Sequence, residues 1–418
     1  MIVSVSTASV SGTIAAPPSK SAMQRAVACA LLSEGRSEII NPSLADDSLS
    51  ALSMAECLGA DIKKLSDRFI IQGGFNPLCN KVFCGESGLG ARLFSVIAAL
   101  SNDWIEITGE GSLTGRPFNM LNKTLTQLGV EVITTNGSLP LKVKGPMKAG
   151  RVIVDGSLSS QFLTGLLIAL PILENNSRLF VRNLKSKPYI DLTIEILNHF
   201  GIKIDNEEYT IFNIPGSQSF KPGVFTVEGD WSGAAFLLVM GAIAGELRIR
   251  NISYLSTQPD TAIIEIIKET GAIVEIAEND ITVRNNELRS FEIDISDCPD
   301  LAPPLAVLAS FCKGKSVIYG TERLKIKESN RGEALEKEFT KLGVKITNYN
   351  DRIEIVGPSK IRGGNVDSHG DHRIAMALTI LSLASDSGVV ITGAESVNKS
   401  YPSFYDDLIQ LGIKIKKT

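Results

Sequence analysis

The sequence is poor in the residues that usually hold metals, and it lacks long apolar runs. Only three of its 418 residues are histidine, so we expect no histidine-based zinc site and no other metal. The six cysteines are scattered without a C-x-x-C pair, and we expect them to be reduced thiols of a cytoplasmic protein. The longest apolar candidate spans only residues 236–244, which is too short for a membrane-spanning helix.

A surplus of basic residues is also missing. The formal net charge is −4, whereas general nucleic-acid binders are usually basic, so we expect neither nucleic acid nor membrane as a partner. The first eleven residues carry no basic stretch of the kind that begins a signal peptide, which again favours the cytoplasm. Net acidity does not exclude a small anionic substrate, because a cleft can concentrate positive charge. A length of 418 residues predicts two or three domains.

One glycine pattern recurs along the whole chain. Six times, at intervals of 69 to 72 residues, a glycine follows a helix-like segment and precedes an apolar residue. Such a glycine is typical of a helix end, where the chain turns with positive φ, and the residues after it alternate as in a strand. The six glycines are Gly59, Gly129, Gly201, Gly271, Gly343 and Gly412. Their near-constant spacing predicts six copies of one supersecondary unit.

A second set of markers runs in step with the glycines. Six segments rich in Ala, Leu, Val and Gly begin at polar positions, and their uniform apolarity predicts helices that are buried on all sides. The markers at these starts are Ser19, Ser87, Ser159, Trp231, Asp300 and Asp371. We therefore predict an α/β protein of two similar domains, each built from three repeated βαβαββ-type units whose buried helices are covered by sheets.

The predicted domains are separated at two places. Gly, Ser and Pro are concentrated at residues 215–223, which indicates a break between the third and fourth repeats. The other crossing is expected near residues 15–18. The first domain then comprises residues 17–225, with its exit crossing within residues 215–228. The second domain is discontinuous and comprises residues 1–16 and 226–418.

Basic residues gather where the predicted buried helices begin. Helix N-termini carry unpaired N–H groups and attract anions. The basic residues at or near these places are Lys20, Arg25, Arg92, Arg116, Lys327, Arg331, Arg373 and Lys399. A glycine-rich Walker loop is absent. If the two domains face each other through these helix starts, the cleft between them would bind a small anion.

The polar motifs also follow a known order. In chain order they are Pro18-Ser19-Lys20-Ser21 with Arg25, Gly115-Arg116-Pro117, Ser159-Ser160-Gln161-Phe162, Ser186-Lys187-Pro188-Tyr189, Glu228-Gly229-Asp230, Pro299-Asp300, Lys327-Glu328 with Arg331, Asp371-His372-Arg373 and Lys399. Each motif is weak alone, but the ordered set over essentially the whole chain resembles the 5-enolpyruvylshikimate-3-phosphate synthases, a family of enolpyruvyl transferases. The resemblance implies an inside-out α/β barrel in each domain and an active site in the interdomain cleft.

The resemblance also implies a reaction. The enolpyruvyl group of phosphoenolpyruvate would move to the 5-hydroxyl of shikimate 3-phosphate through a tetrahedral intermediate, with release of phosphate. This is a step of chorismate and aromatic amino acid biosynthesis, and it needs no cofactor. We expect a cytoplasmic monomer. The implied ligands of shikimate 3-phosphate are Lys20, Ser21, Arg25, Ser159, Ser160, Gln161, Ser186, Tyr189, Asp300, Arg323 and Lys327. Those of phosphoenolpyruvate are Lys20, Gly88, Arg116, Gln161, Arg331, Arg373 and Lys399.

The implied chemistry moves two protons. A base must take the proton of the attacking hydroxyl, and an acid must protonate the methylene carbon of phosphoenolpyruvate. Asp300 is the candidate base and Glu328 the candidate acid, with Lys20 able to assist either. The surrounding cations would stabilise charge in the intermediate. Asp371 and His372 are expected to cap a helix and to orient neighbouring groups rather than to react.

Some positions depart from the family pattern, and other functions compete. Glu86 stands where the family commonly has Asn, Leu93 where it has Pro, and Arg323 where it often has Asn. The nearest alternative is an enolpyruvyl transferase for a UDP-sugar, but that family uses a loop cysteine and residues 111–117 contain none. A non-enzymatic, repeat-built clamp would need cations along helix faces. An RNA 3′-phosphate cyclase would need a supported nucleophilic histidine.

Overall fold

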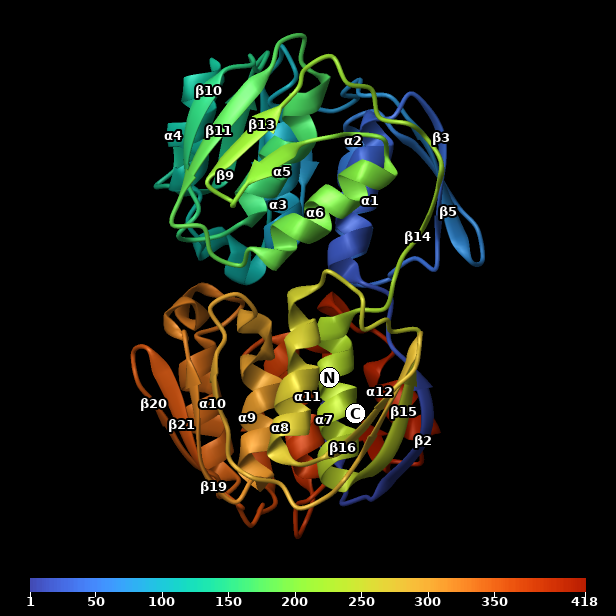
Figure 1. The fold of residues 1–418 in the computed structure, drawn as a ribbon, viewed down its shortest axis with the longest axis vertical. Coiled ribbons are helices and arrows are strands. Elements are labelled where there is room, and N and C mark those ends of the chain that lie inside the picture. Colours follow the sequence, from blue (N-terminus) through green and yellow to red (C-terminus); the bar gives the residue numbers. More distant parts are fainter. The chain divides into compact units, whose positions relative to one another are not determined.

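A computed structural model describes all 418 residues. The chain forms two compact units, and we call Pro18–Val227 the first unit and Met1–Pro17 with Glu228–Thr418 the second unit. None of the helices combines the length and the hydrophobicity that crossing a membrane requires. Each unit contains three four-stranded sheets, and Figure 1 shows helices lying between the sheets of each unit.

The third repeat of the first unit shows the repeating plan in full. Its elements are β10 (Arg151–Asp155), α5 (Gln161–Ala169), η3 (Leu170–Ile172), β11 (Ser177–Arg182), α6 (Pro188–His199), β12 (Asp205–Glu207) and β13 (Ile211–Ile214). Strands β10 and β11 are parallel, while β13 pairs antiparallel with β11 and β12. Because two parallel strands need a crossover, α5 lies between β10 and β11 in the chain. The predicted βαβαββ unit is confirmed.

The other two repeats of the first unit follow the same order. Repeat one comprises α1 (Lys20–Leu32), β3 (Gly35–Ile40), α2 (Asp46–Cys57), β4 (Asp61–Lys64), β5 (Arg68–Gly73) and β14 (Val224–Thr226). Repeat two comprises β6 (Lys81–Phe83), α3 (Gly88–Ala98), β7 (Ile105–Thr108), η1 (Gly111–Gly115), α4 (Asn119–Leu125), η2 (Thr126–Leu128), β8 (Glu131–Thr135) and β9 (Ser138–Lys144). Strand β14, from the far end of the unit, pairs parallel with β3 and completes the sheet of repeat one.

The second unit repeats the plan three more times. Repeat four comprises β2 (Val10–Ala15), α7 (Trp231–Ala244), β15 (Gly245–Arg250), η4 (Pro259–Ala262), α8 (Ile263–Thr270), β16 (Ile273–Ile276) and β17 (Asp280–Arg284). Repeat five comprises β18 (Glu292–Asp294), η5 (Pro299–Leu301), α9 (Ala302–Phe311), β19 (Gly314–Tyr319), η6 (Glu322–Ile326), α10 (Arg331–Lys341), β20 (Lys345–Asn348) and β21 (Arg352–Gly357). Repeat six comprises β22 (Gly364–Asp367), α11 (His372–Ser382), β23 (Val389–Thr392), η7 (Ala394–Lys399), α12 (Phe404–Gln410), β24 (Ile415–Lys417) and β1 (Ile2–Val5).

The start of the chain closes the second unit. Strand β1 pairs antiparallel with β23 and β24, and β2 pairs parallel with β15. All six sheets thus have one parallel pair followed by two antiparallel pairings. Two strands that are adjacent in sequence therefore complete two different repeats.

The six predicted cap glycines all have the expected backbone conformation. Their φ angles lie between +77° and +119°, a region that glycine adopts without the steric cost of a Cβ. At Gly59 an added Cβ would also lie 2.6 Å from backbone atoms of Asn76. The repeat signal in the sequence therefore has a direct physical cause at the helix ends.

The predicted buried helices form the centre of each unit. In the first unit α3 packs on α5, and in the second unit α9 packs on both α7 and α11. Every residue of α3 is buried, and the Trp231 side chain at the start of α7 is fully enclosed. The interiors of the two units are separate clusters of apolar side chains.

The expectation of six reduced cysteines is wrong in one respect. Cys57, at the end of α2, forms a disulfide with Cys79. After the turn at Gly59 the chain returns alongside this helix end, where the Leu78 amide donates to the Cys57 carbonyl at 2.9 Å. The remaining thiols are buried cysteines at 29, 84, 298 and 312, and burial raises the pKa of the Cys84 thiol to about 12.

Candidate functional site

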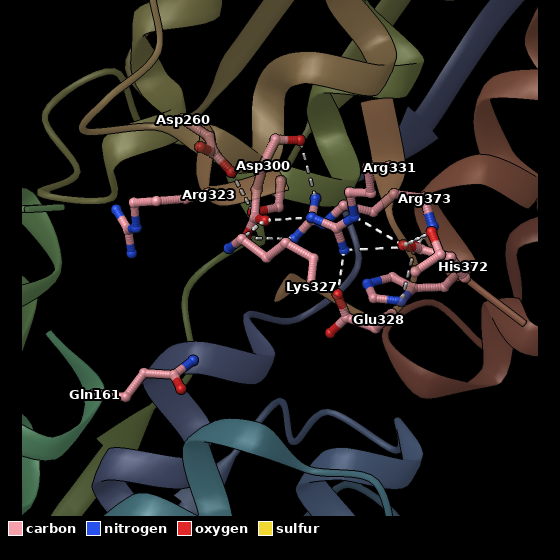
Figure 2. Close-up of polar contacts among 12 residues, drawn as sticks. Gln161, Asp260, Asp300, Arg323, Lys327, Glu328, Arg331, His372 and Arg373 are labelled. Carbon is pink, nitrogen blue, oxygen red and sulfur yellow. Dashed lines mark hydrogen bonds and ion pairs between the residues drawn. The ribbon is translucent and has the colours of Figure 1, made fainter. Parts of the chain in front are cut away.

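Three carboxylates of the second unit surround the Arg331 guanidinium. Arg331 is the first residue of α10 and is 1% exposed. Its Nη1 donates to Asp300 Oδ1 at 2.7 Å, its Nη2 to Glu328 Oε2 at 2.5 Å, and its Nε to Asp371 Oδ2 at 2.8 Å. Figure 2 shows the Asp300 and Glu328 side chains reaching this guanidinium. Paired charges of this kind are what allow ionised groups to be buried.

Asp300 is the carboxylate that gathers most cations. Besides Arg331, the Lys327 ammonium donates to its Oδ1 at 3.2 Å and the Arg373 guanidinium to its Oδ2 at 3.0 Å. Burial by itself raises the pKa of Asp300, but the charges of Arg373, Lys327 and Arg331 outweigh burial and hold the pKa well below its usual value. Asp300 is therefore ionised at neutral pH.

The N-terminal ends of three helices, α9, α10 and α11, bring these groups together. Asp300 lies on η5, directly before the buried helix α9, and Arg331 begins α10. Asp371 caps α11, since its side chain accepts a hydrogen bond from the Arg373 amide at 2.9 Å. The cap therefore also fixes Arg331, and the expectation that Asp371 caps a helix is confirmed. The Ser329 hydroxyl adds a further hydrogen bond to Asp371, at 3.1 Å.

Lys327 carries a perturbed ammonium group. Burial lowers the pKa of Lys327 to about 8, and although Asp300 opposes this, the nearby charges of Arg331 and Arg323 add to it. Arg323 lies on η6 and donates to the Ser296 carbonyl at 3.4 Å. Lys399, another predicted ligand, lies buried at the end of η7.

In the first unit Lys20 and Arg25 share helix α1 but have different surroundings. Lys20 donates to Asp47 Oδ2 at 2.9 Å, in a pair that is largely shielded from solvent. The buried Arg25 donates to the Thr193 hydroxyl at 2.9 Å and to the Ser21 and Tyr189 carbonyls at 2.8 and 3.3 Å. Burial lowers the pKa of Arg25 to about 10. Most of its donors already meet protein acceptors.

Gln161 belongs to a second group in the first unit. The Arg92 guanidinium donates to Gln161 Oε1 at 3.0 Å, to the Gly88 carbonyl at 3.1 Å and to the Pro117 carbonyl at 3.2 Å. It also lies over the Phe118 ring, 4.7 Å from the centroid. Arg92 therefore fixes the orientation of Gln161, the first residue of α5.

The remaining predicted residues of the first unit lie beside these two groups. A Cβ on Gly88 would lie 3.0 Å from Arg116 Nη1, so Gly88 and Arg116 are close neighbours. Ser159 and Ser160 precede α5, and the Ser159 hydroxyl accepts from the Gln161 amide at 3.2 Å. Ser186 precedes α6 with φ +57°, and the Tyr189 ring lies 5.9 Å from the Arg25 guanidinium.

Sequence reasoning missed two carboxylates that lie at these sites. Asp47 pairs with Lys20 across 27 residues of sequence, and no motif connects the two. Asp260, on η4, is buried and interacts electrostatically with Asp300. A signal for Asp260 did exist, because Pro259-Asp260 begins a 3₁₀ turn just as Pro299-Asp300 does. No group of three or more His, Cys, Asp or Glu is arranged to hold a metal ion.

The fold of two units with three repeats each is that of the enolpyruvyl transferases. The solved enolpyruvyl transferase NikO from Streptomyces tendae superposes with a TM-score of 0.81 at 16% identity, covering 100% of this chain and 98% of NikO. EPSP synthase from Acinetobacter baumannii superposes with a TM-score of 0.83 at 25% identity, and both chains are covered in full. At 16% identity the likeness to NikO concerns the fold alone.

Comparison of sequences identifies the family. The family model described as EPSP synthase (3-phosphoshikimate 1-carboxyvinyltransferase) matches residues 5–408. A 3-phosphoshikimate 1-carboxyvinyltransferase from Clostridium kluyveri is 39% identical over 416 residues, which cover 99% of this chain and 98% of the relative. One from Methanococcus maripaludis is 38% identical over 427 residues and both chains are covered in full. The chain belongs to the EPSP synthase family of transferases.

Proposed function

We propose that this protein transfers the enolpyruvyl group of phosphoenolpyruvate to the 5-hydroxyl of shikimate 3-phosphate and releases phosphate. The observation that carries the proposal is the cluster of Asp300, Lys327, Glu328, Arg331 and Arg373, found in a chain that matches the family model over residues 5–408. The cluster combines a carboxylate kept ionised with several buried cations. Such a set suits a reaction between two anions that also moves protons.

Substrate binding would use the chemistry of these side chains. Both substrates carry a phosphate and a carboxylate, which Arg and Lys bind through charge-assisted hydrogen bonds. We assign shikimate 3-phosphate to Lys20, Ser21, Arg25, Ser159, Ser160, Gln161, Ser186, Tyr189, Asp300, Arg323 and Lys327. We assign phosphoenolpyruvate to Lys20, Gly88, Arg116, Gln161, Arg331, Arg373 and Lys399.

Asp300 would act as the base. Its carboxylate is ionised because Arg373, Lys327 and Arg331 lower its pKa, and an ionised carboxylate can accept the proton of the attacking hydroxyl. Because its pKa is low, the Asp300 carboxylate is a weak base in the free enzyme. When substrate anions share Arg373, Lys327 and Arg331, these cations stabilise Asp300 less, and its pKa rises. Substrate binding would thus strengthen the base at the moment it is needed.

Glu328 would act as the acid toward the methylene carbon, with Lys20 assisting. In the free protein the Arg331 guanidinium stabilises the ionised Glu328 carboxylate through their 2.5 Å contact. Because phosphoenolpyruvate would recruit Arg331, the same binding event would release Glu328 to carry a proton. The cations would then stabilise the tetrahedral intermediate, since they are in place before charge develops. The protein would work as a cytoplasmic monomer without a cofactor.

Phosphate release by the purified protein tests this proposal. We expect release only when shikimate 3-phosphate and phosphoenolpyruvate are both present. A UDP-sugar in place of shikimate 3-phosphate should give no release, since the η1 segment that would carry the required cysteine contains none. The proposal would be contradicted by phosphate release with phosphoenolpyruvate and the UDP-sugar but not with shikimate 3-phosphate. It would also be contradicted if phosphoenolpyruvate gave no phosphate with either acceptor.

A further inference from the structure

One buried carboxyl beside the candidate site belongs to none of the assigned ligands. Asp260 lies on η4 and is 1% exposed. The Ser232 hydroxyl, on the first turn of α7, donates a hydrogen bond to Asp260 Oδ2. Asp260 Oδ1 is buried and has no hydrogen-bond partner in the protein. An ionised carboxylate would be poorly compensated in such a place.

The neighbours of Asp260 include two central residues of the candidate site. The titratable and charged groups that act on it or face it are Asp230, Cys298, Asp300 and Arg373. Figure 2 shows its carboxyl directed toward Asp300. Burial and the negative charge of Asp300 raise the pKa of Asp260 to about 7, against the opposing effects of Arg373 and the Ser232 hydrogen bond. The two carboxyls thus differ strongly in their affinity for a proton.

We propose that Asp260 is a positioning residue of the transfer reaction: in its uncharged form beside Asp300 it leaves the Arg373 guanidinium to Asp300 and phosphoenolpyruvate. The inference rests on the proposed function, in which Arg373 binds phosphoenolpyruvate. If Asp260 ionises, a second carboxylate competes with the substrate for Arg373. It also repels the charge on Asp300. Binding of phosphoenolpyruvate should therefore weaken as Asp260 loses its proton.

The KM for phosphoenolpyruvate between pH 5.5 and 8.5 tests this role. Asp260→Asn mimics the uncharged carboxyl, and the ratio of wild-type to variant KM removes the ionisation of the substrates themselves. We expect this ratio to rise about tenfold with pH, the factor that corresponds to a coupling of one pKa unit, while kcat of the variant stays within about threefold. Asp351→Asn, at an exposed carboxylate of the same unit, should follow the wild type. A ratio that is constant with pH would overturn the proposal.

A second variant, Ser232→Ala, predicts the direction in which the pH dependence of KM should move. The Ser232 hydrogen bond lowers the pKa of Asp260, so Ser232→Ala should keep Asp260 protonated to higher pH. We expect the rise in KM to move to higher pH in this variant. A rise that stays in place or moves to lower pH would contradict the role of Asp260.

Thermal unfolding separates this inference from the proposed function. The unfolded chain loses the Asp260 proton near pH 3.8, whereas the folded protein keeps it to about pH 7. Folding therefore takes up a proton in this window, and the wild type should lose stability relative to Asp260→Asn as pH rises from 5 to 7. Above pH 7 the two melting curves should shift in parallel. A constant difference in Tm would overturn the inference even in an active enzyme. Absence of turnover in the wild type would overturn the proposed function, and with it the role in substrate binding.

Discussion

Replacing Asp300 with asparagine removes one negative charge from the centre of the cation cluster without changing the size of the side chain. The carboxylate accepts hydrogen bonds from Arg331, Arg373 and Lys327 at 2.7, 3.0 and 3.2 Å. Asparagine keeps one acceptor oxygen for Arg331 but turns an NH₂ group toward a cation. Hydrogen bonds to charged groups contribute about 1.5–3 kcal/mol each, so we expect the variant to lose roughly 2–3 kcal/mol of stability and still fold.

The effect on turnover should be larger than the effect on stability. Asparagine cannot take a proton, and a positioned general base is typically worth about 10²–10⁴ in rate. That range corresponds to roughly 3–5 kcal/mol of barrier. Initial rates of phosphate release at saturating substrates, with circular dichroism as a check of folding, measure the loss. Asp297→Asn, at an exposed carboxylate three residues earlier, is the matched control and should keep its activity. A folded Asp300→Asn protein with kcat within threefold of wild type would remove Asp300 from the chemistry.

The pH dependence of stability gives the same prediction a second check. The folded pKa of Asp300 lies well below its unfolded value of 3.8, so its stabilising effect is present above pH 3.8. It is lost as pH falls through the lower, folded value. The gap in stability between wild type and Asp300→Asn should therefore be full at neutral pH and shrink in acid. A gap that grows below pH 4 would refute the assignment of Asp300 as an ion-paired carboxylate.

Three further perturbations follow from the contacts of the two units. The pKa of Lys327 is about 8, so turnover that needs the Lys327 charge should decline above that pH. Lys327→Arg should move this decline to higher pH. An active variant whose turnover declines at the same pH as the wild type would exclude Lys327 as the cause of the decline. Arg92→Lys removes the guanidinium that donates a hydrogen bond to Gln161, so the KM for both substrates should rise several-fold in steady-state kinetics. Unchanged KM values would show that Gln161 does not need Arg92 to orient it. Glu338→Gln weakens the contacts of this side chain with the partly exposed Lys341 and His369, at 2.6 and 2.9 Å. Urea unfolding should show that the free energy of unfolding falls by roughly 2 kcal/mol, which is less than the 3–5 kcal/mol typical of a fully buried pair.

The repeat architecture can be predicted from the sequence because its signals are local. A glycine such as Gly271, with φ +99°, marks a helix end wherever it occurs. Helices such as α7, which are apolar on every side, indicate their burial directly. These features need no knowledge of distant partners. The number and type of repeats therefore follow from the amino-acid sequence alone.

The strands that complete each unit are harder to predict, because pairing between distant segments leaves no periodic trace. Strand β14 pairs with β3, more than 180 residues earlier in the chain. The same is true of the disulfide between Cys57 and Cys79, whose separation of 22 residues matches no familiar spacing. Backbone hydrogen bonds from Leu78 and Cys79 to the Cys57 carbonyl, after the turn at Gly59, accompany the approach of the two cysteines.

The candidate site can likewise be predicted only in part from the sequence. The motifs identify the cations and Asp300, but not how the side chains satisfy one another. Arg331 and Asp371 are 40 residues apart, and Asp371 alone resembles an ordinary helix cap. The partner carboxylates Asp47 and Asp260 lie outside all of these motifs. The assignment of individual residues to each substrate stays a prediction, because it concerns contacts with molecules that only a bound complex contains.

The most direct test of the central claim follows the phosphorus atoms of both substrates during turnover. In ³¹P nuclear magnetic resonance of the purified protein with shikimate 3-phosphate and phosphoenolpyruvate, the phosphoenolpyruvate signal should convert into inorganic phosphate. One new phosphate-ester signal should replace that of shikimate 3-phosphate for each phosphate released. Enolpyruvyl transfer predicts this one-to-one conversion and no change when either substrate is omitted. Phosphate formed from shikimate 3-phosphate, or formed from phosphoenolpyruvate alone, would contradict the account.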